Sequence, residues 1–191
     1  AMAREGDRPK LSRETVARQN DALVAGINHV LGPEDVLIHA GDVAWRDLAT
    51  LREFRDRLVV REIYVAIGNH DVEDELVAVF GRDNVTERFM VEVGGQRAVI
   101  DHYPGYSWQE SHRGAWLLFG HVHGAENALR RQDPAYSLSI DVGVDSHEFR
   151  PWLWTEELVP LFADRKPAFD RWCKQKYPGK GSGGMAPVGP V

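Results

Sequence analysis

The chain has 191 residues, of which 43% are apolar, and a formal net charge of −6. These values favour a single domain with a sizeable core, which we place at residues 1–177. They disfavour disorder and extended binding to nucleic acid. A single cysteine, Cys173, excludes an internal disulfide and a thiolate-rich metal site. The sequence contains no bilayer-spanning apolar stretch and no secretory signal at its start, so we expect a cytoplasmic protein.

Helical and strand patterns alternate through the first half of the chain. Apolar spacing predicts helices at 12–31, 48–58 and 72–80, and buried strands at 36–40 and 63–67. Ser12 can cap the first helix and Gly32-Pro33 ends it. A strand, a helix and a second strand are typical of a parallel sheet, in which ligands gather beyond the carboxyl ends of the strands.

The second half of the chain has a β-rich pattern. We expect a hairpin formed by 85–93 and 97–101 around Gly94-Gly95, and further strands at 115–119 and 136–142. Beyond Pro151 the pattern is less regular, with Trp152 and Trp154 at the edge of the core and a short helix at 168–176. The Gly- and Pro-rich stretch 178–191 is expected to form a flexible tail or linker.

Four of the predicted strands are followed by side chains that can bind metals. These are Asp42 after the first strand, Asn69-His70-Asp71 after the second, His102 after the hairpin, and His121 and His123 after the strand at 115–119. Each motif alone has an ordinary explanation, such as a turn or a helix cap. Their joint occurrence favours one site. A carboxylate, imidazoles and an amide oxygen suit a pair of Mn, Fe, Zn, Co or Ni ions that activates water against a phosphate ester.

This ordered set resembles the calcineurin-like metallophosphoesterase superfamily, and most of all its small, stand-alone bacterial and phage-type members. The residues that carry the resemblance are Gly41-Asp42, Gly68-Asn69-His70-Asp71, His102 and Gly120-His121-Val122-His123, within a stretch that runs from about Ser12 to Pro151 and includes 139–145 (SIDVGVD). The resemblance implies an α/β fold of two packed mixed β-sheets flanked by helices. It also implies a phosphatase or phosphodiesterase that acts on a small phosphate ester.

The resemblance assigns metal ligands at the matching positions. Asp42 would bridge two divalent ions. Asn69, His102 and His121 would complete one metal site, and His123 would belong to the other.

Other residues are candidates for contacts with the substrate. The resemblance implies that His70 touches the scissile phosphate and assists the leaving group, and Asp71 is placed to orient His70 by accepting its other N–H. Trp45 and Arg46 follow the expected bridging carboxylate and are candidates to line the substrate cleft, although Arg46 also fits an ordinary surface charge. His112 is a loop histidine and a weaker candidate of the same kind.

The sequence departs from the family at its start. The family opens with a strand that ends in Asp-x-His and gives two ligands to the second metal, whereas 1–10 contains no His. Asp145-Ser146-His147 has that spacing but follows the last strand, so we interpret it as a loop. One metal is expected in place of two if the segment is absent.

Three explanations for this departure stay open. The chain is circularly permuted, with a native start at Met185-Ala186 after the linker-like 181–184; or its start is truncated; or it is a natural member that has lost one metal site. In the first two cases a complementing segment that carries the missing strand is an expected partner.

Two classes of function compete. The first is a metal-dependent phosphoric ester hydrolase that works through metal-activated water. The alternative is a binding or scaffolding module of the same fold, catalytically weakened, with one incomplete metal site. A nuclease is a third option, which the acidic charge disfavours.

Overall fold

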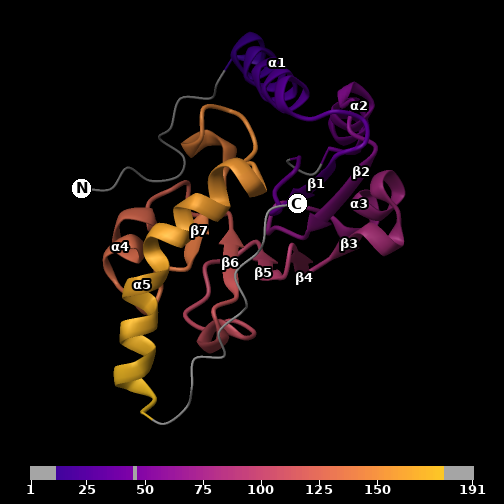
Figure 1. Cartoon of the computed structure of the whole chain (residues 1–191). Helices are drawn as coiled ribbons and strands as arrows, with labels where there is room; N and C mark the ends of the chain where they lie inside the picture. The colour runs from indigo at the N-terminus through magenta and orange to yellow at the C-terminus, as the bar shows by residue number, and fades with distance from the viewer. Residues whose placement is uncertain (1–11, 45–46, 179–191) are drawn as a thin grey trace, which may run out of the picture.

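A computed structural model describes residues 12–44 and 47–178 (Figure 1). The fold is α/β, with a three-stranded sheet, a four-stranded sheet and helices around them. The helices are α1 (Arg13–Val30), α2 (Leu48–Arg57), α3 (Glu73–Phe80), α4 (Asn127–Gln132) and α5 (Val159–Lys176). The strands are β1 (Val36–His39), β2 (Glu62–Ala66), β3 (Val85–Thr86), β4 (Arg88–Val93), β5 (Gln96–Asp101), β6 (Trp116–Phe119) and β7 (Ser139–Asp141). Within these residues, no helix has the length and apolar character needed to cross a membrane.

The three-stranded sheet has the order β1-β2-β3 and is parallel in both of its pairs. Its strands are joined through α2 and α3, as parallel neighbours require. Only the four-stranded sheet is mixed, so the expectation of two mixed sheets is corrected for the described residues.

Alternating side chains of β1 face two different cores. Leu37 is buried with Val24 of α1 and Leu51 of α2, whereas Ile38 packs against the apolar cluster of the other sheet. Tyr64 of β2 also meets Phe89 of β4, with ring centroids 5.7 Å apart. These contacts pack the two sheets together, with α1, α2 and α3 on the outer side of the smaller one (Figure 1).

The four-stranded sheet has the order β4-β5-β6-β7, with an antiparallel β4–β5 hairpin and parallel β5, β6 and β7. The hairpin turns at Gly94 and Gly95, which both have positive φ. The strand predicted at 85–93 is in fact two strands: Val85 and Thr86 pair with β2, and the chain then enters the other sheet at Arg88. This crossing joins the two sheets covalently.

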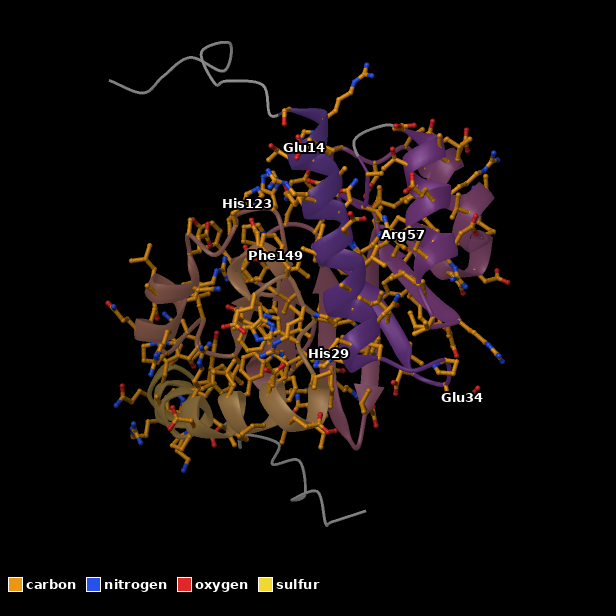
Figure 2. The ribbon with its side chains drawn as sticks, turned by 90° about the horizontal axis from the view of Figure 1, so that it is seen from above. Glu14, His29, Glu34, Arg57, His123 and Phe149 are labelled. Carbon is orange, nitrogen blue, oxygen red and sulfur yellow. The ribbon has the colours of Figure 1, made fainter. Side chains whose placement is uncertain are left out.

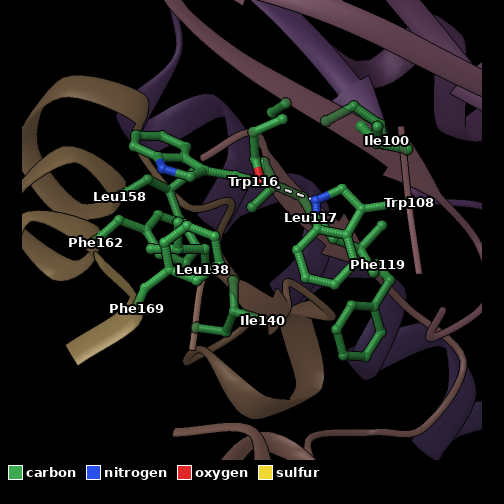
Figure 3. Packing of buried hydrophobic residues seen from close by; sticks show 14 of the residues in the cluster. Ile100, Trp108, Trp116, Leu117, Phe119, Leu138, Ile140, Leu158, Phe162 and Phe169 are labelled. Atoms are coloured by element: carbon green, nitrogen blue, oxygen red, sulfur yellow. Dashed lines mark hydrogen bonds between the residues drawn. The ribbon is translucent and has the colours of Figure 1, made fainter. Parts of the chain in front are cut away.

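The core of the larger sheet surrounds β6, whose four residues are all buried. The ring of Trp116 lies 4.4 Å from that of Phe162 in α5 and 5.0 Å from that of Trp154. Trp108 donates its indole N–H to the carbonyl of Ala115 at 2.8 Å, which satisfies the one polar group of a buried ring (Figure 3). Burial of such side chains contributes about 1.5–3 kcal/mol each.

The last third of the chain is more helical than its sequence predicted. The expected helix at 168–176 is the end of α5, which begins at Val159 and follows a π-helical turn, η5 (Trp154–Leu158). The helix α4 was not predicted, and the strand expected at 136–142 spans only Ser139–Asp141. Most of the predicted tail, 179–191, lies outside the described residues.

Helix α1 links the two halves of the molecule. Ser12 caps it by accepting the Thr15 amide at 3.1 Å, as predicted. A Cβ on Gly26 would lie 2.1 Å from the carbonyl oxygen of Phe149, which belongs to the loop after β7. Phe149 accordingly lies beside α1 (Figure 2), and only glycine permits this approach.

Candidate metal centre

Loops that follow β1, β2, β5 and β6 meet at one place. Asp42, His102 and His121 each present a ligand atom, and these atoms all lie within 4.8 Å of one another. Asn69 joins them, because its Oδ1 lies 3.0 Å from Nε2 of His102. We call Asp42, Asn69, His102 and His121 the inner cluster. It combines residues from both sheets, each at the carboxyl end of a strand.

His102 is the buried centre of this cluster, with 1% of its side chain exposed. Its Nδ1 donates to the carbonyl of Ala40 at 2.8 Å, because a carbonyl can only accept. In the neutral ring, Nε2 then presents a lone pair to Oδ1 of Asn69 and to Oδ2 of Asp42, which is 3.4 Å away. A cation between these atoms would satisfy all three groups.

The separations within the cluster suit a metal ion. Two ligands about 2.1 Å from one ion lie about 3.0 Å apart at a right angle and about 3.4 Å apart at a tetrahedral angle. Asn69 and Asp42 lie at 3.0 Å and 3.4 Å from Nε2 of His102. Mixed nitrogen and oxygen donors favour Mn, Fe, Zn, Co or Ni.

Backbone strain is concentrated at the same place. Six residues other than glycine have positive φ in the described chain, and three of them are Asp42 (57°), His121 (73°) and His123 (51°). Such a conformation costs about 1–3 kcal/mol per residue and persists only where the surroundings enforce it. Strain at three predicted ligands is typical of a functional site.

Two glycines allow the ligand loops to approach each other. A Cβ on Gly68 would lie 2.2 Å from Oδ1 of Asp42, and a Cβ on Gly41 would lie 2.6 Å from Nδ1 of His102. Gly41 also has a φ of 92°, which favours glycine. The predicted Gly-Asp and Gly-Asn-His-Asp motifs therefore need their glycines for steric reasons.

The carboxylate of Asp71 accepts hydrogen bonds from the backbone of both ligand loops. Its Oδ2 accepts the amides of Asp42 (2.7 Å) and Gly68 (2.9 Å), and its Oδ1 accepts the amide of Val43 (2.9 Å). Asp42 in turn accepts the amide of His70 at 2.9 Å. These bonds of Asp71 serve the backbone around Asp42, and its orientation of the His70 ring stays a prediction.

His39 supports the same loop from the end of β1. The amide of Gly41 donates to its Nδ1 at 3.1 Å. Burial lowers the pKa of His39, and the carboxylates of Asp71 and Asp42 oppose this effect only in part. His39 is therefore a neutral residue that supports the loop after β1.

His123 lies outside the group that Asp42, His102 and His121 form. Its Nδ1 pairs with Oδ2 of Asp145, and 79% of the His123 side chain is exposed. The hydrogen bond that His123 donates to Asp145 raises the pKa of His123, burial opposes this, and the charges of Asp145, Asp141 and Asp42 add to the rise. We call His123 and Asp145 the outer pair.

Comparisons with known proteins add information on the fold. No protein-family model and no curated protein matches the chain. Among solved structures, the chain is similar to the protein of unknown function AQ665 from Aquifex aeolicus, with a TM-score of 0.55 and 22% identity over 70% of this chain and 80% of that one. At this identity the similarity supports the α/β fold and carries no statement on activity.

Of the predicted substrate-binding residues Trp45, Arg46 and His112, the structure describes only His112. Trp45 and Arg46 lie outside the described residues. His112 lies in the turn η3 (Ser111–Arg113) before β6, whereas His121 follows that strand, so the two histidines are at opposite ends of it. His112 lines a cavity of about 260 Å³ among aromatic side chains.

Sequence reasoning missed three residues around the site. Tyr103 has its ring 4.9 Å from that of His102 and 4.8 Å from that of His121, and it is half exposed. Asp145, from the turn η4 (Val144–Ser146), was interpreted only as part of a loop after the last strand. Asp141 is fully buried and accepts the amides of residues 124 and 143. The available signals were the segment 139–145, which contains Asp141 and Asp145, and the Asp-x-His spacing at 145–147.

Proposed function

We propose that the chain is a metal-dependent phosphoesterase of the calcineurin-like metallophosphoesterase type that hydrolyses a small phosphomonoester or phosphodiester. One observation carries the proposal. Oxygen and nitrogen lone pairs of Asp42, Asn69, His102 and His121 converge from four loops and two sheets. Two packed sheets with outer helices are consistent with that fold.

The residues of the inner cluster would hold the metal. His102 is fixed by Ala40 so that Nε2 faces the site, and Asp42 uses Oδ1 for the amide of His70 while Oδ2 remains directed at His102. A bound divalent ion of Mn, Fe, Zn, Co or Ni supplies a Lewis acid and a water of lowered pKa. His121 is exposed and completes the outer side of the cluster.

His70 is the proposed catalytic residue. It follows Asn69 directly, it is half-buried, and its backbone is tied to Asp42. An imidazole there can bind a phosphoryl oxygen and donate a proton to the leaving oxygen. We propose one tightly held ion in the inner cluster and a weaker second one at Asp42 and His123.

A second candidate function is a binding or scaffolding module that holds one ion and turns over slowly. The observation that favours it is the outer pair, in which His123 is bonded to Asp145 and lies outside the inner group. Under this alternative, metal content is about one ion per chain and turnover stays near the uncatalysed rate.

The test is hydrolysis of para-nitrophenyl phosphate and its bis-ester with each of the five metals, together with metal content by mass spectrometry. The phosphoesterase proposal expects turnover that Asp42→Asn and His70→Ala reduce by several orders of magnitude. Asp56→Asn, an exposed carboxylate on α2, is the matched control and keeps full activity. Equal turnover in the wild type and Asp42→Asn, or no turnover with any metal, defeats the proposal.

A further inference from the structure

We infer that Asp71 is a positioning residue that acts through Asp42: its carboxylate fixes the backbone of both ligand loops and so sets where the Asp42 side chain stands. This inference rests on the proposed metal site and concerns metal binding, not turnover. It is separate from the expected role of Asp71 as a partner of the His70 ring, which stays a prediction.

The bonds of Asp71 join two segments that are distant in sequence. The amides of Asp42 and Val43 come from the loop after β1, 28 or 29 residues before Asp71, and the amide of Gly68 comes from its own loop after β2. Hydrogen bonds from amides to a carboxylate are shorter and roughly twice as strong as neutral ones. One side chain therefore sets the spacing between the two loops.

These three bonds also define what else Asp71 can do. An ionised carboxylate offers about four acceptor positions, and three of them receive backbone amides. Three backbone amides thus hold this carboxylate in one orientation. Its chemistry fits a fixed support.

Asp42 needs such a support because its backbone is strained. Its φ of 57° follows a φ of 92° at Gly41, and this pair of left-handed residues turns the Asp42 side chain toward His102. Asp71 accepts hydrogen bonds from the two amides that flank the Asp42 Cα, which are those of Asp42 itself and of Val43. Without them the loop can relax to a negative φ, and the carboxylate would leave the cluster.

The main experiment is metal binding by Asp71→Asn, which keeps the size of the side chain and replaces one acceptor by an amide that repels an N–H donor. We expect the dissociation constant for Co²⁺ or Mn²⁺ to rise by about 10–100-fold, the range for residues that orient metal ligands. The visible d–d spectrum of bound Co²⁺ should change with it. Asp74→Asn, an exposed carboxylate at the start of α3, is the matched control and binds like the wild type.

A double-mutant cycle separates positioning from a general structural effect. If Asp71 acts through Asp42, then Asp71→Asn adds little to the loss already caused by Asp42→Asn. Fully additive losses, or an unchanged dissociation constant and Co²⁺ spectrum in Asp71→Asn, overturn the inference.

Hydrogen exchange on the metal-free wild-type protein gives a test that does not depend on folding of a variant. The amides of Asp42, Val43 and Gly68 should be protected to a similar degree, because one carboxylate holds them. Exchange at the rate of an open loop overturns the inference. If Asp71→Asn weakens Co²⁺ binding as expected but the wild-type chain hydrolyses no phosphate ester, only the proposed function is refuted.

Discussion

The inner cluster and the outer pair both contain metal ligands that the sequence motifs predict. They differ in the hydrogen bonds that hold these ligands. In the inner cluster, His102 is buried and bonded to a carbonyl, so its second nitrogen must face the site. In the outer pair, His123 is largely exposed and its ring is paired with the carboxylate of Asp145. An imidazole is preorganised as a metal ligand when one ring nitrogen is hydrogen-bonded to the backbone and the other faces the site. It is less available to a metal when a neighbouring side chain already binds it.

The difference between the inner cluster and the outer pair does not come from the hydrogen bonds that hold the backbone of their loops. Asp71 lies beneath the loops of the inner cluster, and the buried Asp141 accepts the amide of Gly124, next to His123. Each loop therefore has a carboxylate that binds its backbone. What separates the two regions is the presence of Asp145 beside an exposed imidazole.

The largest expected effect compares the two histidines directly. His102→Ala should weaken Mn²⁺ binding by more than the about 10–100-fold typical of residues that only orient ligands, whereas His123→Ala should weaken it by less than about 10-fold. Isothermal titration calorimetry on the two variants measures both values. Equal losses would show that both histidines bind the same tight ion and would remove the distinction.

A smaller effect tests how tightly the backbone of the inner cluster is packed. Gly68→Ala places a methyl group 2.2 Å from Oδ1 of Asp42, so the free energy of unfolding should fall by about 1–3 kcal/mol. Gly32→Ala is the matched control, because its Cβ would meet only a side-chain oxygen 3.6 Å away. Urea denaturation of both proteins gives the comparison, and an equally stable Gly68→Ala variant would mean that the loops can separate.

The smallest effect concerns the protonation of the outer pair. Asp145 raises the pKa of His123 chiefly through its hydrogen bond, so Asp145→Asn should lower that pKa, as followed by NMR titration of the imidazole protons. A raised folded pKa stabilises the fold fully below the ordinary value of 6.5, and this contribution is lost as pH rises through the folded pKa. The variant should therefore lose a little stability below about pH 6.5 and none at alkaline pH. An unchanged imidazole pKa would mean that the pair does not persist in solution.

Much of the first half of the fold was accessible from sequence because its elements carry local signals. Apolar spacing located α1, α2 and α3, and turn residues located the hairpin. The rule that ligands gather beyond parallel strands then brought Asp42 and Asn69 together. These inferences need only periodicity and chain order.

The remaining features depend on contacts that periodicity does not encode. Pro160 and Pro167 weaken the helical signal of α5 in the sequence. The first half of this helix is stabilised by packing of Phe162 on Trp116. The change of sheet between β3 and β4 leaves the alternating pattern of side chains intact, so a single strand was predicted. The pairing of His123 with Asp145 spans 22 residues and follows from loop geometry alone.

The bond from His102 to the carbonyl of Ala40 has a consequence for the folding of the chain. It connects groups 62 residues apart that belong to different sheets, so neither sheet contains the cluster by itself. Contacts of such long range form late, since their loop entropy must be offset by structure already in place. Capture of a coloured or paramagnetic ion during refolding would then report the docking of the two sheets, and an ion held there would slow their separation.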